Sequence, residues 1–181
     1  MKIVITISGL HGTGKSTYAR VVARSFKLRH VSAGELFRQI AAERNCSIAE
    51  LSLEAEKDIA VDCLLDDRTR QEIRKGDVVI DGLLASWIAK DTVALKIYLL
   101  APYQTRIGRI ASRDGVSYDE AERLTILREQ IERRRFKRFY GIDIDDLSIY
   151  DLVFNTGLMS TDLNIGVIKS LVKRYIKSNR G

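Results

Sequence analysis

Proline and cysteine are scarce in this 181-residue chain, and both shortages limit what the chain can be. There is one Pro, and no repeat, low-complexity stretch or Pro/Gly/Ser-rich linker, so we expect a single domain over residues 1–181. The two cysteines, Cys46 and Cys63, stand in no CxxC or other metal-ligand spacing. Two unpaired thiols are typical of a reducing cytoplasm, and we expect both in the core.

Long apolar runs are also lacking. No stretch approaches the ~20 apolar residues that cross a bilayer, so we expect no membrane partner. The opening "MKIVITIS" is too short for the apolar region of a secretory signal and has no small-residue cleavage site. These absences favour a cytoplasmic protein.

Positive charge is in excess. The net charge is +6, and arginine outnumbers lysine. Arginine suits bidentate contacts with phosphate oxygens, which indicates a phosphate-rich partner, although a mildly basic solvated surface explains the charge equally well. Nucleotides and nucleic acids both fit, so charge does not choose between them.

Strand-like and helix-like segments alternate along the chain. Five β-branched or apolar segments predict buried parallel strands at 2–7, 28–31, 77–81, 94–100 and 151–155. Helices are predicted at 15–26, after Ser32 to about 44, from Ser47, at 58–75, between 81 and 94, at 102–112, 118–140 and 160–177. This order predicts an α/β fold with a five-stranded parallel sheet and helices on both faces.

The segment "GLHGTGKST" matches the P-loop pattern in full, between a predicted strand and a predicted helix. Its backbone N–H groups are expected to cradle phosphates, Lys15 to contact the β- and γ-phosphates, and Ser16 to bind Mg²⁺. A catalytic role for His11 is possible, but because the loop binds through its backbone we treat His11 as a variable position. The predicted ATP-binding residues are Gly9, Leu10, His11, Gly12, Thr13, Gly14, Lys15, Ser16 and Thr17.

Two further segments place polar groups at the carboxyl ends of predicted strands, where parallel sheets bind ligands. Ser32, Gly34 and Arg38 follow the second strand, and we expect them to bind a monophosphate; an N-cap serine and a solvated arginine are the plain alternative. Asp81 ends the third strand beside the P-loop, where it is expected to order water on Mg²⁺.

A third group is a helical hairpin rich in arginine. Arg106, Arg109 and Arg113 share one face of the first helix, and the second helix carries Arg128, Arg133, Arg134, Arg135 and Arg138. Facing rows of arginine would form a lid over the phosphates and exclude water. Interspersed glutamates, Glu120, Glu122, Glu129 and Glu132, also allow a solvated basic face.

The P-loop alone leaves several protein classes open. The guanine-specific NKxD pattern of GTPases is absent, and Asp81 is followed by "GLLA" and not by the spacing of a GTPase switch. Motor and transporter ATPases are usually larger. A small-molecule kinase with a separate acceptor site remains.

Several motifs together resemble the short archaeal form of cytidylate kinase, within the adenylate-kinase-like nucleoside monophosphate kinases. The resemblance runs through "GLHGTGKST", "SAGELFR", "RDGVSYDEA" and above all "RFYGIDIDDLSIYDLVFNT", and it covers nearly the whole chain. It implies a P-loop NTPase fold with a helical monophosphate-binding segment at about 33–75 and a short lid at about 106–135. The implied reaction transfers a phosphoryl group from ATP to CMP or dCMP, giving ADP and CDP or dCDP, and it requires Mg²⁺.

The resemblance has two departures. Relatives often have Arg where this chain has Leu83, so an arginine expected near the acceptor is missing. Archaeal relatives frequently have Thr in place of the P-loop lysine, whereas Lys15 is the commoner choice in P-loops. For catalysis we expect Lys15, Arg128 and Arg135 around the moving group, with Arg106 and Arg109 in the lid. No general base is expected, because a monophosphate oxygen is already anionic.

Alternatives from the residues alone remain. The acceptor could be AMP or a non-nucleotide alcohol, because spacing does not reveal the base. A protein of another class, an RNA-associated NTP-binding protein, is suggested by "RRRFKRFY", which mixes basic and aromatic residues. We expect a monomer without nucleic acid.

Overall fold

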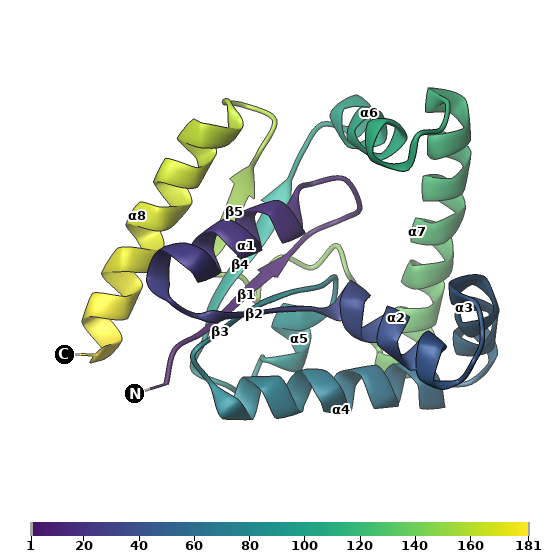
Figure 1. The fold of residues 1–181 in the computed structure, drawn as a ribbon, viewed down its shortest axis with the longest axis horizontal. Helices are drawn as coiled ribbons and strands as arrows, with labels where there is room; N and C mark the ends of the chain where they lie inside the picture. The colour runs from purple at the N-terminus through teal and green to yellow at the C-terminus, as the bar shows by residue number, and fades with distance from the viewer. Residues whose placement is uncertain (1, 181) are drawn as a thin grey trace.

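The structure, a computed structural model, describes residues 2–180 and is built on a parallel sheet of five strands (Figure 1). The strands are β1 (Val4–Ser8), β2 (Arg29–Ser32), β3 (Val78–Asp81), β4 (Leu95–Leu100) and β5 (Leu152–Asn155). Their order in the sheet is β2-β3-β1-β4-β5, with β1 central. Every pairing is parallel, as the alternation of strands and helices predicted.

The central strand is buried on both faces, with apolar side chains on one face and Val4 together with the hydrogen-bonded Thr6 and Ser8 on the other. All five residues of β1 are buried. Ile5 and Ile7 pack with Tyr18 and Val22 of one helix layer, whereas Val4 packs with Ile80 and the opposite layer. Successive side chains of a strand point to opposite faces, so a run of β-branched residues requires cover on both sides.

Helices α1 (Lys15–Phe26) and α8 (Thr161–Arg180) cover one face of the sheet, and α4 (Ala60–Lys75) and α5 (Ala85–Ile88) cover the other. The remaining helices are α2 (Ala33–Glu43), α3 (Ile48–Lys57), α6 (Tyr103–Asp114) and α7 (Tyr118–Tyr140). Figure 1 shows α2, α3, α6 and α7 gathered on the side of the molecule away from α8. The long helix α7 runs from α6 at one end towards α3 and α4 at the other.

Two helices begin with a serine cap. Ser47 and Glu50 form a reciprocal capping box at α3, and the hydroxyl of Ser117 accepts from the N–H of Glu120 at α7. Ser32 precedes α2 but makes no capping bond with its side chain. The expectation for the cysteines is wrong for Cys63, which is exposed, whereas Cys46 is half-buried against the α2–α3–α4 cluster.

Within residues 2–180, no helix combines the length and the apolar character needed to cross a membrane.

Candidate functional site

The P-loop connects β1 to α1 and is shaped by glycines with positive φ. Gly14, at φ +92°, is the N-cap of α1, and the first turn of the helix holds no acidic residue. Gly12 has φ +79°, and a Cβ on it would lie 2.5 Å from the carbonyl oxygen of Arg106. The loop therefore presents a helix N-terminus to an anion, and α6 packs directly on the loop backbone.

Lys15 lies folded back over the loop. Its Nζ donates to the carbonyl of Leu10 at 3.0 Å. Desolvation lowers the pKa of Lys15 to about 8, against the opposing effect of the nearby carboxylate of Asp81. Phosphate oxygens would restore the lost solvation, so the ammonium is prepared for a polyanion.

Asp81 joins three separate segments at the carboxyl end of β3. Its Oδ1 accepts from the hydroxyl of Ser16 at 2.9 Å and from that of Ser32 at 3.2 Å. Its Oδ2 lies 2.7 Å from Nε2 of His30 on β2. Ser32 thus donates its hydroxyl proton to Asp81, and its side chain makes no capping bond at α2. The carboxyl ends of β2, β3 and β1 meet here, as parallel strand order dictates.

The predicted monophosphate-binding residues lie together beside Asp81. A Cβ on Gly34 would stand 3.7 Å from Oγ of Ser32 and 3.8 Å from Nη1 of Arg38. The guanidinium of Arg38 therefore folds back over the start of α2, towards Ser32. Arg38 is exposed, and within residues 2–180 its side chain makes no hydrogen bond or ion pair.

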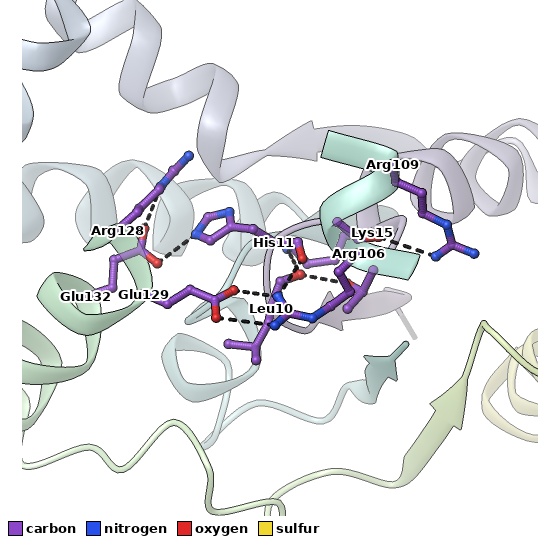
Figure 2. Close-up of polar contacts among 10 residues, drawn as sticks. Leu10, His11, Lys15, Arg106, Arg109, Arg128, Glu129 and Glu132 are labelled. Carbon is purple, nitrogen blue, oxygen red and sulfur yellow. Dashed lines mark hydrogen bonds and ion pairs between the residues drawn. The ribbon is translucent and has the colours of Figure 1, made fainter. Parts of the chain in front are cut away.

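The two arginines of α6 nearest the loop are committed to its backbone (Figure 2). Nη1 of Arg106 donates to the carbonyl of His11 at 2.8 Å and to Glu129 at 2.6 Å. Nη1 of Arg109 donates to the carbonyl of Gly12 at 3.3 Å and to the hydroxyl of Thr156 at 3.1 Å. Both guanidinium groups therefore hold the P-loop in shape.

Glu132 of α7 contacts the P-loop through the side chain of His11. Its Oε2 lies 2.7 Å from Nε2 of His11, and its Oε1 accepts from Nε of Arg128 at 3.0 Å. Burial alone would raise the pKa of Glu132, but His11 and Arg128 outweigh burial and hold it at about 2. Burial lowers the pKa of His11, with the charge of Glu132 opposing, and the carboxylate accepts from Nε2 of the imidazole. The side chain of His11 therefore connects the P-loop to α7, a contact that the sequence did not predict.

Farther along α7, Arg135 faces α4. Its Nε stands 3.1 Å from Oδ2 of Asp62, although neither atom has an aligned hydrogen bond. Burial raises the pKa of Asp62 to about 6 in spite of this arginine. The pair connects the helix of the predicted lid to the predicted monophosphate-binding segment.

The expected facing rows of arginine do not occur. Between α6 and α7, Arg106 faces Glu129 and not another arginine, and it is only 6% exposed. Arg113 pairs with its neighbour Asp114 on the surface. Two like charges packed at that depth would repel, so a carboxylate stands opposite the buried guanidinium.

Sequence reasoning missed Glu129 and Glu132, yet a signal was available. Both fall on the face of α7 that is defined by Ala121, Thr125 and Phe136. Apolar and small residues that recur at spacings of three and four residues mark the buried face of a helix. Acidic residues on it are therefore inward and need partners, whereas Glu120 is exposed at the helix start.

Comparison with known proteins agrees with this geometry. A model of the cytidylate kinase-like family matches residues 4–158. The chain belongs to this family. It is 46% identical to a cytidylate kinase of Staphylothermus marinus over 175 residues, covering 97% of this chain and 99% of the relative. It is 43% identical to a cytidylate kinase of Desulfurococcus amylolyticus over 180 residues, covering 99% and 97%. The predicted resemblance is thereby confirmed.

Solved structures share the fold at low identity. A shikimate kinase from Bacteroides thetaiotaomicron superposes with a TM-score of 0.64 at 16% identity, covering 98% of this chain and 99% of that chain. An uncharacterized protein from Eubacterium ventriosum gives a TM-score of 0.71 at 18% identity, covering 98% and 99%. The predicted P-loop kinase fold, with its five-stranded parallel sheet, is confirmed.

Leu83, the position at which the resemblance implied an arginine, packs into an apolar cluster with Leu84, Phe136 and Ile144. The side chain contributes no charge to the acceptor side. Arg38 stands beside Gly34, with Nη1 3.8 Å from the position of a Cβ there.

None of the aromatic residues in the strip "RRRFKRFY" is fully exposed. Phe136 is buried, and Phe139 and Tyr140 are half-buried. Arg133 pairs with Asp145, and Arg135 pairs with Asp62. The strip borders an open hollow of about 760 Å³, with Arg134, Lys137 and Arg138 on its wall. Binding single-stranded RNA by stacking requires exposed rings, so this geometry argues against that function.

Proposed function

We propose that the protein transfers the γ-phosphoryl group of ATP to CMP or dCMP, giving ADP and CDP or dCDP. The observation that carries the proposal is the position of Asp81. Its one carboxylate accepts from Ser16 of the P-loop and from Ser32 at the start of α2. The donor loop and the acceptor segment therefore meet within hydrogen-bond distance, as an in-line transfer between two phosphates requires.

The identity of the acceptor is supported by the relatives. Cytidylate kinases that match the chain along nearly its whole length are 39–46% identical to it. The P-loop residues Gly9–Thr17 would bind ATP, with backbone N–H groups and Lys15 on its phosphates and Thr17 at the α-phosphate. Ser32, Gly34 and Arg38 would bind the monophosphate, within a segment at about 33–75.

Ser16 and Asp81 fit a magnesium ion that arrives with ATP. Within residues 2–180 there is no group of three or more His, Cys, Asp and Glu placed to hold a metal by itself. Magnesium is typically held by one or two protein oxygens together with water and substrate phosphates. A hydroxyl and a carboxylate 2.9 Å apart at the P-loop supply such oxygens, Ser16 directly and Asp81 through water. When bound, the ion neutralises charge on the β- and γ-phosphates.

The residues of the chain do the remaining work by position and charge. Lys15 would hold the β- and γ-phosphates, Arg38 would hold the acceptor phosphate in line, and Arg128 and Arg135 would meet the transferred group. The moving group spreads charge over its equatorial oxygens, so fixed cations stabilise the transition state. The attacking oxygen is already anionic, and no general base is needed.

The lid, at about 106–135, has a divided role in this proposal. Arg106 and Arg109 shape the P-loop from α6, because their terminal nitrogens are bonded to its carbonyls. Arg128 on α7 is the exposed arginine assigned to substrate in this proposal, and Arg135 would join it by leaving Asp62 on closure. Closure of the hairpin over both nucleotides would exclude water and prevent hydrolysis of ATP. We further propose a cytoplasmic monomer, consistent with two free thiols.

An ADP-release assay with ATP and Mg²⁺ tests the proposal directly. CMP, dCMP, UMP, AMP, GMP and shikimate are supplied one at a time. We expect release of ADP with CMP or dCMP far above the rate without acceptor. Faster release with AMP would assign the chain to another base, and faster release with shikimate would assign an alcohol acceptor. Binding to RNA with a steep salt dependence, and no release with any monophosphate, would indicate the RNA-associated class.

A further inference from the structure

Arg128 is held at one nitrogen and free at two. Its Nε donates to Oε1 of Glu132 at 3.0 Å, one turn along α7. Its side chain is 62% exposed, and across residues 2–180 no hydrogen bond or ion pair engages Nη1 or Nη2. The contact therefore fixes the plane of the guanidinium. The two terminal nitrogens, here called the fork, remain open to bind an incoming group.

The neighbouring arginines are different. Arg106 uses its terminal nitrogens on Glu129 and on the carbonyl of His11. Arg109 uses its terminal nitrogens on Gly12 and Thr156. Neither has an open fork in this structure. Figure 2 shows Arg106 and Arg109 directed at the loop, whereas Arg128 extends beyond Glu132.

Glu132 is itself fixed. Its side chain is 11% exposed, and its second oxygen takes the hydrogen bond from His11 in the P-loop. A single carboxylate therefore connects the loop that binds the phosphates to the arginine above it. Lys15 interacts electrostatically with both Arg128 and Glu132, so these groups and the ammonium expected to contact ATP lie within range of one another's charge.

We propose that Glu132 is a positioning residue, which orients Arg128 through Nε so that the two terminal nitrogens meet the transferred phosphoryl group. The hydrogen bond from His11 fixes this orientation relative to the P-loop. The inference rests on the proposed phosphoryl transfer and adds a residue that touches no substrate. A preoriented fork loses little freedom when it binds phosphate, so its benefit appears in the transition state.

The variants Glu132→Ala, Glu132→Asp and Glu132→Gln separate orientation from charge. Alanine removes the acceptor oxygens, and aspartate keeps the charge but is too short to reach both partners. Glutamine loses the charge but keeps an oxygen that can accept from Nε of Arg128. We expect the alanine and aspartate variants to lower kcat by about 10-fold or more, with both KM values within about 2-fold of wild type. Glutamine should recover most of the turnover.

A double-mutant cycle with Arg128→Ala completes the test. If Glu132 acts through Arg128, the double variant Arg128→Ala with Glu132→Ala should be no slower than Arg128→Ala alone. Gln130→Ala and Arg123→Ala, at exposed positions of α7, are matched controls and should keep wild-type kinetics. If the alanine variant does not fold, the comparison of Glu132→Asp with Glu132→Gln decides the matter.

Wild-type kcat in Glu132→Ala and Glu132→Asp, or losses that multiply in the double variant, would overturn the positioning role. A glutamine variant as slow as alanine would also overturn it, because charge and not orientation would then matter. The wild-type enzyme in the same assay reports on the proposed function. Absence of CMP-dependent turnover there refutes both proposals, whereas normal turnover with a multiplicative cycle refutes the role of Glu132 alone.

Discussion

The hydroxyl of Ser16 donates to Oδ1 of Asp81 at 2.9 Å, so the P-loop and the end of β3 form one hydrogen-bonded unit. The variant Asp81→Asn keeps the shape but loses the charge. We expect kcat to fall by roughly 10²-fold and the Mg²⁺ concentration for half-maximal rate to rise, because the oxygen pair would attract the ion less. Titration of the rate with Mg²⁺ at saturating ATP measures both. Asp58→Asn, on the surface between α3 and α4, is the control, and an unchanged magnesium dependence in Asp81→Asn would refute the assignment.

Replacement of Arg106 by alanine should mainly lower stability, whereas replacement of Arg128 should mainly lower kcat. Arg106→Ala leaves Glu129 buried without its partner, which typically costs about 3–5 kcal/mol of unfolding free energy. Arg128→Ala removes a largely exposed side chain and should change the unfolding free energy by less than about 1 kcal/mol while lowering kcat. Urea unfolding and steady-state kinetics on both variants make the comparison. Equal loss of stability in the two would contradict the division of roles.

Arg38→Ala should weaken the acceptor selectively. Loss of one charge-assisted contact is worth about 1.5–3 kcal/mol, so the KM for CMP should rise by roughly 10- to 100-fold while that for ATP barely moves. Arg44→Ala, near the end of the same helix and exposed, is the matched control. A defect confined to ATP would place Arg38 on the donor side.

The pH dependence of stability should carry a contribution from Asp62. Its pKa rises from 3.8 in the unfolded chain to about 6 in the folded chain. Between these pH values the folded state binds more protons, so this group lowers the unfolding free energy as pH rises, by about 2–3 kcal/mol in total. The stabilisation is complete below about pH 3.8 and is lost above about pH 6.

Urea unfolding of Asp62→Asn at pH 4 and pH 7 isolates that contribution. Relative to wild type, the variant should gain stability at pH 7 compared with pH 4, because the ionised carboxylate is gone. Asp67→Asn, at an exposed position of the same helix, should leave the difference between the two pH values unchanged. An identical difference in Asp62→Asn and wild type would show that Asp62 ionises normally.

Much of the site could be predicted because it follows from local pattern and strand order. The P-loop is defined by neighbouring residues, and Ser32 and Asp81 end adjacent parallel strands, which brings them to one edge. The contacts of α7 could not be predicted in the same way. Whether Glu132 meets solvent or His11 depends on how the α6–α7 hairpin packs on the loop, at a sequence separation of 121 residues. The count of charges along the hairpin suggested a solvated or phosphate-facing surface, whereas packing turned Arg106 and Glu129 inward.

Transfer of label from γ-labelled ATP to CMP tests the central claim most directly, with the wild-type protein and Lys15→Ala compared side by side. The account predicts that label appears in CDP with little free phosphate, and that Lys15→Ala folds normally but transfers roughly 10²–10³-fold more slowly. Label released as inorganic phosphate, or near-normal transfer by Lys15→Ala, would contradict it.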